Sequence, residues 1–591
     1  MFEFCFRELE VSDTFKKCYP FFGVDEDGGN SARVVEGVSI RTAPVVADGD
    51  VCNPSVSFVR AGVTGRRDLI PAGGNRLYHT RQPISIHQTM DKETDAASTA
   101  STPQDTKPAA ASSDKKSFGR DVGKLVSGTV IAQAVALCLT PVITRIFSPE
   151  VYGVASVFTS LVSIIVVIAC MRYELAILLP KDDKDAGAVF HLCLIILVCI
   201  SLFCIPVIIL FGDLIAGLLG SDAVKDYLFL VPVAVFIDGL YLALRYWNTR
   251  RKRFGTQAAT QAMQSISGNG LKLGFGTLGL INPGSLILGD LLGKGAGTLV
   301  LLLQAVRADL KLILQSFSLK NIRKQMIRFK KFPLIDTWSS FINTLSWQMP
   351  VLLLTSFFSP AIAGFYTLGF QMTQAPLSLV GGSISQVFFQ RLSVAKHDGT
   401  MGEITTDICS LLFLITVFPC LLLMAVGGDL FSLVFGSGWY EAGVFAQILA
   451  IWIMIWFVAS VLSPVISILE IQGLGFMTSS ANLITRAVSL VIGGVIGSVY
   501  LGLWLFSLTG ILVSAYCIFA FMRKTGGSFV RVWKNIWVEI LFGAGAFVVL
   551  VLLEVLGVSG FVTCGVAILI GVCYVVWLVR KNLLVKSYLF R

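Results

Sequence analysis

Charged side chains are scarce in this sequence. Only 14% of its 591 residues are Asp, Glu, Lys or Arg, whereas hydrophobic residues make up 54% and the mean hydropathy is +0.76. A soluble globular domain carries about 25% charged residues, because water must wet its surface. So low a proportion indicates that most of the surface of this protein contacts lipid.

Clustered metal ligands are also missing. The sequence has four histidines and no Cys-x-x-Cys pair, and most of its 13 cysteines lie within or beside apolar runs. Zinc sites and disulfide frameworks need closely spaced ligands. We therefore interpret the cysteines as small packing residues, and we expect neither a metal nor a cofactor.

Nucleic-acid and nucleotide sites are not indicated either. The net charge of +10 would suggest nucleic acid only if the basic residues shared one face or domain, but they form short clusters between apolar runs. The segment 289–295 superficially resembles a phosphate-binding loop. It fails the Gly-x-x-x-x-Gly-Lys-Ser/Thr spacing, and it lies inside an apolar run instead of following a strand.

Residues 1–118 form an N-terminal extension that differs from the rest. It contains no run long enough to cross a membrane and no signal-peptide pattern. From Met90 to Lys116 it becomes a low-complexity polar stretch that cannot bury enough apolar area to fold. We predict that the extension is largely disordered. Residues 1–89 are either a small cytosolic extension or sequence translated from too early a start, and we favour the second, with Met90 as the natural initiator.

Apolar runs follow one another beyond Phe118. A helix needs about 20 apolar residues to cross the hydrocarbon core, and these runs do not alternate as the strands of a membrane β-barrel do. We predict an all-α integral membrane protein with about 14 transmembrane helices. The predicted spans are 122–145, 152–171, 186–211, 227–247, 256–280, 285–306, 333–357, 361–389, 406–427, 442–469, 474–496, 498–521, 536–556 and 560–579.

Lys and Arg gather in alternate connections between these spans. Their clusters lie at 172–184, 250–253, 307–331, 391–396, 523–534 and 580–586, and the intervening connections hold almost none. By the positive-inside rule this pattern places the clusters, and with them both termini, in the cytoplasm. We expect a multi-pass protein of the cell (cytoplasmic) membrane.

A short motif occurs twice. Residues 147–153 read FSPEVYG and residues 358–364 read FSPAIAG, each after a predicted span. Six spans separate the copies, so the halves would be parallel repeats; chance is the alternative, since Ser-Pro turns are common between helices. The predicted domains are the extension 1–118, an N-terminal lobe of six helices at 119–306, a basic cytoplasmic linker at 307–332, a six-helix C-terminal lobe at 333–522, and helices thirteen and fourteen with a cytoplasmic tail at 523–591.

Three segments carry a family resemblance. Residues 141–153 (PVITRIFSPEVYG), 172–180 (RYELAILLP) and 244–247 (LRYW) resemble the oligosaccharide flippase, or Wzx-like polysaccharide biosynthesis, family of the multidrug/oligosaccharidyl-lipid/polysaccharide (MOP) superfamily. The resemblance covers about residues 118–580. It implies a transporter that moves undecaprenyl-diphosphate-linked oligosaccharide to the outer leaflet, for polysaccharide or lipopolysaccharide biosynthesis. The two predicted lobes indicate that it works by alternating access. Membrane lipid and polysaccharide polymerase machinery are then expected partners.

Ionisable residues inside a membrane span are costly, so each is a candidate for function. Lys272 and Arg486 lie well inside two spans with no opposite charge one helical turn away, and we expect them to bind an anionic head group. Snorkelling to the interface is the alternative. Arg145 and Arg172 lie at span ends; interfacial anchoring would explain them, but the family resemblance favours substrate binding.

Three further residues are candidates for ion coupling. Asp290 and Lys294 are spaced i, i+4, which predicts a self-neutralised pair on one helix face; a coupled proton or cation site is the alternative. Asp238 is a second acidic candidate, with helix packing through hydrogen bonds as the alternative. Without a nucleotide site, transport is expected to use H⁺, Na⁺ or the substrate gradient.

Rival functions make different demands on the sequence. A multidrug or cation exporter of the same superfamily would need an acidic cavity, whereas the candidates here are of mixed charge. A lipid II flippase would share the fold and differ mainly in substrate. A membrane enzyme would need a sizeable aqueous domain, and the predicted connections are short, so we expect no enzyme and no catalytic residues.

Overall fold

The computed structural model describes residues 109–581. All of them belong to one compact unit of the chain, Pro103–Arg591. The proposed initiator Met90 and most of the predicted extension lie outside the described residues. Within them, the first helix begins at Ala109, earlier than the predicted first span.

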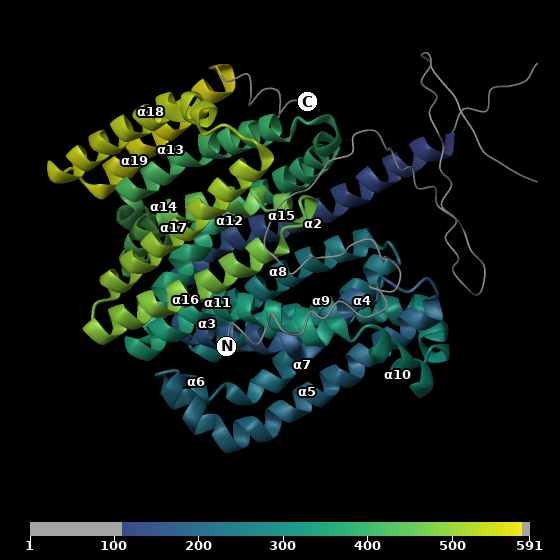
Figure 1. Cartoon of the computed structure of the whole chain (residues 1–591). Helices are drawn as coiled ribbons and strands as arrows, with labels where there is room; N and C mark the ends of the chain where they lie inside the picture. Colours follow the sequence, from purple (N-terminus) through teal and green to yellow (C-terminus); the bar gives the residue numbers. More distant parts are fainter. Residues whose placement is uncertain (1–108, 582–591) are drawn as a thin grey trace, which may run out of the picture. The chain divides into compact units, whose positions relative to one another are not determined.

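Long helices occupy every predicted span. Fourteen helices of at least 20 residues occur in the described chain, and its remaining elements are short helical turns (Figure 1). The long helices are α2 (Ala109–Ile146), α3 (Pro149–Ala169), α5 (Asp183–Leu218), α7 (Val231–Arg250), α8 (Phe254–Thr277), α9 (Pro283–Gln315), α11 (Thr337–Phe357), α12 (Pro360–Asp398), α13 (Met401–Phe435), α14 (Tyr440–Leu462), α16 (Gln472–Ile496), α17 (Val499–Thr525), α18 (Phe529–Val555) and α19 (Gly560–Lys581).

Short helical elements join the long ones. They are α4 (Tyr173–Ala176), α6 (Asp222–Lys225), η1 (Leu228–Leu230), α10 (Leu319–Arg328), η2 (Phe332–Asp336), η3 (Ser437–Trp439) and α15 (Pro464–Ile468). Most are single turns, so little of the described chain lies in water-exposed domains between spans.

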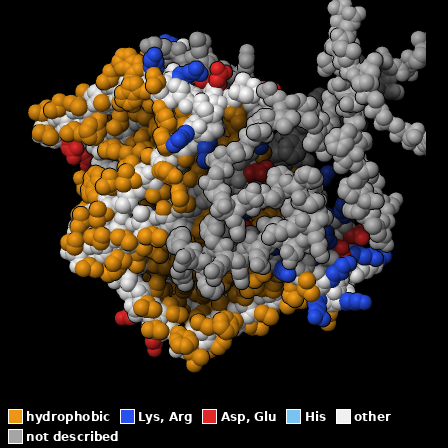
Figure 2. All heavy atoms as spheres, in the orientation of Figure 1, with side chains coloured by type: hydrophobic (Ala, Val, Ile, Leu, Met, Phe, Trp, Pro, Cys, Tyr) orange, Lys and Arg blue, Asp and Glu red, His pale blue; other side chains and the backbone are white. Residues whose placement is uncertain are grey.

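Eleven regions of this chain are long and apolar enough to cross a membrane by length and composition. Large apolar side chains such as Phe203, Ile209 and Leu210 of α5 are 68%, 76% and 73% exposed, and Figure 2 shows apolar side chains over much of the visible face. The prediction of an all-α multi-pass membrane protein is confirmed. The three long helices that do not meet the criterion are α8, α11 and α12, so the number of 14 spans stays a prediction.

The repeated motif forms the start of α3 and of α12. Ser148 and Ser359 cap these helices, each accepting a hydrogen bond from the backbone N–H three residues later, at 3.4 Å. Pro149 and Pro360 then open the first turn. Proline suits this position because its missing N–H would have no partner there. The Ser-Pro pair therefore sets both helix starts locally.

The packing of the N-terminal half (α2–α9) recurs in the C-terminal half (α11–α17). In the first, α2 packs on α8, α8 on α9, α9 on α7, and α7 on α5 and α3. In the second, α11 packs on α16, α16 on α17, α17 on α14, and α14 on α13 and α12 (Figure 1). The order of the helices along the chain is the same in both halves. This is the arrangement expected of a parallel repeat.

The two motif copies also contact each other. A Cβ atom at Gly153 would overlap the carbonyl oxygen of Pro360, and one at Gly364 would overlap that of Pro149. Glycine is thus required at both positions for α3 and α12 to approach this closely. The contact is reciprocal, and it joins the two halves at the helix ends that the charge pattern assigns to the outside.

The two C-terminal helices, α18 and α19, attach to the second half along α13. The rings of Phe418 and Tyr574 stack at 4.1 Å between centroids, and the Tyr574 hydroxyl donates to the Leu414 carbonyl at 2.9 Å. The helices are therefore an addition to the repeat.

Candidate functional site

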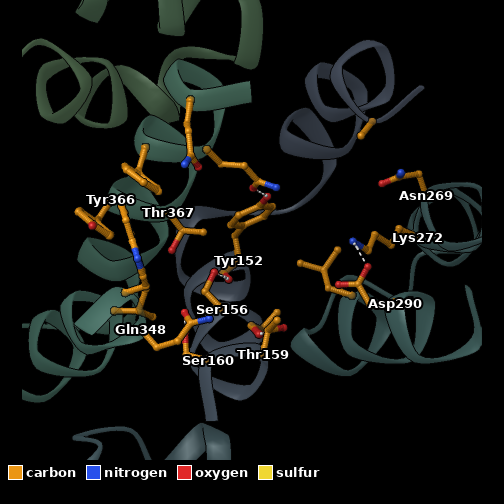
Figure 3. Close-up of a pocket in the computed structure, with 18 residues that line it drawn as sticks. Tyr152, Ser156, Thr159, Ser160, Asn269, Lys272, Asp290, Gln348, Tyr366 and Thr367 are labelled. Atoms are coloured by element: carbon orange, nitrogen blue, oxygen red, sulfur yellow. Dashed lines mark hydrogen bonds and ion pairs between the residues drawn. The ribbon is translucent and has the colours of Figure 1, made fainter. Parts of the chain in front are cut away.

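A cavity of about 570 Å³ lies between the two halves. The first half contributes α2, α3, α8 and α9 to its wall, and the second half contributes α11 and α12 (Figure 3). The three long helices that are not apolar enough to count as membrane spans by composition, α8, α11 and α12, all line it. Hydroxyl and amide side chains make up much of the wall, namely Ser156, Thr159, Ser160, Asn269, Gln348, Thr367, Gln371 and Gln374.

Two hydrogen bonds cross the cavity wall from one half to the other. Ser160 of α3 donates to the side-chain oxygen of Gln348 of α11 at 3.2 Å, and the Tyr152 hydroxyl donates to that of Gln371 of α12 at 3.2 Å. Polar groups within a membrane protein need such partners or water. The lack of a sufficiently apolar stretch in α8, α11 and α12 was the sequence signal that could have identified this wall, and our sequence reasoning did not use it.

Lys272 lies in the wall and is paired. Its ammonium is 2.6 Å from a carboxylate oxygen of Asp290, on the neighbouring helix α9 (Figure 3). A Cβ atom at Gly289 would lie 2.6 Å from Cγ of Lys272, so glycine leaves room for the lysine to lie across α9. Lys272 therefore has an acidic partner, although no acid lies one helical turn away on its own helix.

Lys294 pairs with Asp238 of α7, at 2.7 Å. The predicted pairing of Asp290 with Lys294 is therefore wrong, because each residue pairs with a different helix. Asp238, Asp290 and Lys294 line one small pocket of about 20 Å³. Asp290 lines both this pocket and the larger cavity. The structure thus brings all three ion-coupling candidates together with Lys272, as two neutral interhelical pairs.

Arg486 is 2% exposed and does not line the cavity. Its guanidinium lies 4.2 Å from the ring centre of Trp347, with Trp452 and Phe506 at 5.3 and 5.6 Å. One guanidinium nitrogen donates to the Ser346 carbonyl at 3.1 Å. Burial of this kind argues against snorkelling. Trp347 does line the cavity, so Arg486 contacts a residue of the cavity wall without lining the cavity itself.

Lys272 and Arg486 occupy equivalent helices of the repeat, since α8 packs on α2 as α16 packs on α11. Each half therefore carries one cation on its fifth long helix. The first is neutralised by a carboxylate at the cavity surface, and the second is held by aromatic rings and Ser346.

Arg145 and Arg172 lie outside the cavity lining, at contacts between the halves. Arg145 donates to the Leu433 carbonyl of α13 at 3.0 Å. Arg172 contacts Asp336 of η2 at 2.9 Å and Glu174 at 3.6 Å. Burial raises the pKa of the Glu174 carboxyl. Arg145 therefore links the first half to α13 of the second half, and Arg172 links the first half to η2, which directly precedes α11.

A second, larger hollow of about 780 Å³ is almost entirely apolar. Helices α2, α12, α13, α14 and α19 line this apolar groove, through residues such as Leu137, Met372, Phe418, Met454 and Val575. Sequence reasoning missed it, because groove-lining and lipid-facing side chains are of the same kinds.

Comparison with known proteins agrees with this architecture. The family model described as polysaccharide biosynthesis protein matches residues 142–444, which confirms the family resemblance. The solved structure of the lipid II flippase MurJ in an inward closed conformation is 14% identical, with a TM-score of 0.59, and the match covers 77% of this chain and 98% of that one. No curated protein sequence gives a match.

A second solved structure also shares the fold. It is an inward-facing multidrug resistance MATE family transporter of the MOP superfamily, 13% identical with a TM-score of 0.51, and the match covers 68% of this chain and 94% of that one. At such identities the likeness concerns the fold.

Proposed function

Because the chain belongs to the polysaccharide biosynthesis protein family, we propose that it is a flippase for lipid-linked oligosaccharide in the cytoplasmic membrane. The observation that carries the proposal is a polar cavity and an apolar groove served by the same two helices. On α2, Ala136 lines the cavity and Leu137 the groove; on α12, Gln371 lines the cavity and Met372 the groove. A molecule with a sugar head and a long hydrocarbon chain needs a polar cavity for the head and an apolar groove for the chain.

Each part of undecaprenyl-diphosphate-linked oligosaccharide then has a place. The sugars occupy the cavity, where amides and hydroxyls offer hydrogen bonds and Trp347 and Tyr366 offer aromatic faces. The hydrocarbon chain lies in the groove, where burying apolar surface is favourable. The diphosphate binds Lys272, in competition with the carboxylate of Asp290. Arg486 joins this site when Trp347 moves aside.

Transport proceeds by alternating access between the two halves. The contacts of Gly153 with Pro360 and of Gly364 with Pro149 support a closed outer end of the cavity. These contacts must separate when the cavity opens to the outside. Arg145 and Arg172 act at interhalf contacts and not in head-group binding, which modifies the role that the sequence suggested. The two ion pairs formed by Asp238, Asp290, Lys272 and Lys294 are the proposed place for coupling to H⁺ or Na⁺. No catalytic step is required.

A reconstituted system tests the proposal. The protein in liposomes is given a fluorescent undecaprenyl-diphosphate-linked oligosaccharide, and its appearance in the opposite leaflet is followed by quenching. We expect the double variant Lys272→Ala/Arg486→Ala to lose translocation while inserting normally. The control is Lys225→Ala, at an exposed lysine paired with Asp213. Full translocation by the double variant would remove both cations from the mechanism.

The same liposomes distinguish the two alternative substrates. Lipid II and an organic cation are offered in place of the oligosaccharide lipid. Preference for lipid II would identify a lipid II flippase, and uptake or export of the cation alone would identify a multidrug exporter.

A further inference from the structure

The connection between α9 and α11 has an unusual charge. Residues 310–335 contain seven Lys and Arg residues and neither Asp nor Glu. All seven are exposed, and none forms an ion pair with any residue in 109–581. They are Lys311, Lys320, Arg323, Lys324, Arg328, Lys330 and Lys331. Figure 2 shows Lys and Arg side chains gathered at the lower right, where Figure 1 places α10.

The nearby basic cluster at the end of α7 is different. Arg250 contacts Asp183 at 2.9 Å, and Arg253 contacts Asp309 at 2.6 Å. Arg251 contacts both carboxylates. Each of these arginines is therefore paired with a carboxylate, whereas the bases of residues 310–335 form no ion pair among residues 109–581.

Exposed apolar side chains lie among the unpaired bases. On α10, Leu319 is 70% exposed, Met326 41% and Ile327 54%. At 3.6 residues per turn Leu319 and Met326 lie side by side, whereas Ile327 lies between the bases Arg323 and Lys320. A different side, with Ile322 and Gln325, is buried, and α10 packs on α5. The exposed surface of α10, which carries both apolar side chains and bases, is thus available for another partner.

We propose that residues 310–335 bind anionic phospholipid head groups at the membrane surface. A surface helix with exposed apolar side chains and bases inserts the apolar side chains at the boundary of head groups and acyl chains, while its bases reach phosphates. The chain is already in the membrane, and the charge pattern puts this segment at the cytoplasmic surface. An acidic soluble protein would satisfy the bases but leave Leu319 and Ile327 in water.

The proposed site has a consequence for the two halves. Residues 310–335 end next to Asp336, which contacts Arg172 of the first half at 2.9 Å. Lipid bound to α10 therefore holds the only chain connection between α9 and α11 at the membrane surface, close to a contact between halves. The proposal is independent of the transported substrate.

Hydrogen exchange of the full chain in lipid nanodiscs tests the site. Amide protection of residues 319–331 is compared between neutral phosphatidylcholine and a mixture containing phosphatidylglycerol. We expect protection to rise in the anionic discs and to fall again with added salt, which screens surface charge. The triple variant Lys320→Gln/Arg323→Gln/Lys324→Gln should reduce the affinity of this segment for an anionic surface on the order of 100-fold. The difference in amide protection between anionic and neutral discs should then disappear.

The matched control is Arg523→Gln/Lys524→Gln, which removes two exposed bases from the end of α17. It should retain the lipid-dependent protection. Equal protection in both kinds of disc, or loss of the difference in the control, would overturn the proposal. Protection that depends on an added acidic polypeptide and not on the lipid would identify a protein partner instead.

Discussion

At the scale of single residues, the cavity contains a cation whose charge is balanced by its neighbour. Asp290 is 45% exposed and Lys272 16% exposed, so an anion entering the cavity meets the carboxylate as readily as the ammonium. A hydrogen bond to a charged group contributes about 1.5–3 kcal/mol. When Lys272 exchanges its contact with Asp290 for one with a phosphate, the free energy therefore changes little. A small change suits a substrate that must be released again.

This balance gives a prediction for the affinity of an anionic head group. Asp290→Asn should strengthen binding of a diphosphate analogue about tenfold, because Lys272 loses its competing partner, and Lys272→Gln should weaken it by a similar factor. Titration of the detergent-solubilised protein measures both. Lys225→Gln is the control, since Lys225 pairs with Asp213 and does not line the main cavity. Changes in the same direction at Asp290 and Lys272 would contradict the competition.

At the scale of elements, the crossing of α3 and α12 depends on two glycines. The reciprocal contact of Gly153 with Pro360 and of Gly364 with Pro149 involves backbone atoms, which cannot rotate away as a side chain would. Any added Cβ must therefore push the two helices apart. The repeat makes the same demand twice, once in each half.

We expect Gly153→Ala to destabilise the closed crossing by about 1–3 kcal/mol, the usual cost of overpacking. The outer end should then open more often. The measurement is the labelling rate of a cysteine placed in the cavity by a membrane-impermeant reagent added outside. Gly382→Ala in α12 is the matched control, because a Cβ atom there meets nothing within 4 Å. Unchanged labelling in Gly153→Ala would show that this contact is not a closure.

At the scale of the whole molecule, the cavity and the apolar groove divide the substrate between them. The groove requires α19 together with four helices of the repeat. This gives the two helices beyond the repeat a role in holding the hydrocarbon chain. The division predicts that the groove affects long-chain substrates only.

Narrowing the groove tests this division. Val575 lines the groove and is 56% exposed, whereas its neighbour Val576 is 46% exposed and does not line it. Val575→Trp should slow translocation of the long-chain substrate several-fold and leave that of a short-chain analogue unchanged. Val576→Trp should behave as the unaltered protein. Equal slowing of both substrates by Val575→Trp would place its effect outside the groove.

The sequence by itself determined the type of fold and the helices. Lipid offers no hydrogen bonds, so a continuous apolar run long enough to cross it must form a helix, and this requirement is local. The Ser-Pro starts of α3 and α12 are local as well, which is why the motif identified the repeat. The low charge, the basic clusters and the family segments could all be read without knowing which helices touch.

Only the tertiary structure decided the partners of the charged residues. Spacing along one helix suggested that Asp290 would pair with Lys294, but the close approach of α8 and α9 at Gly289 brings Lys272 to Asp290 instead. Arg486 is held by rings from three other helices, and no local pattern encodes that arrangement. Contacts between helices depend on how side chains of distant segments fit together, so these pairings were decided when the helices of each half packed.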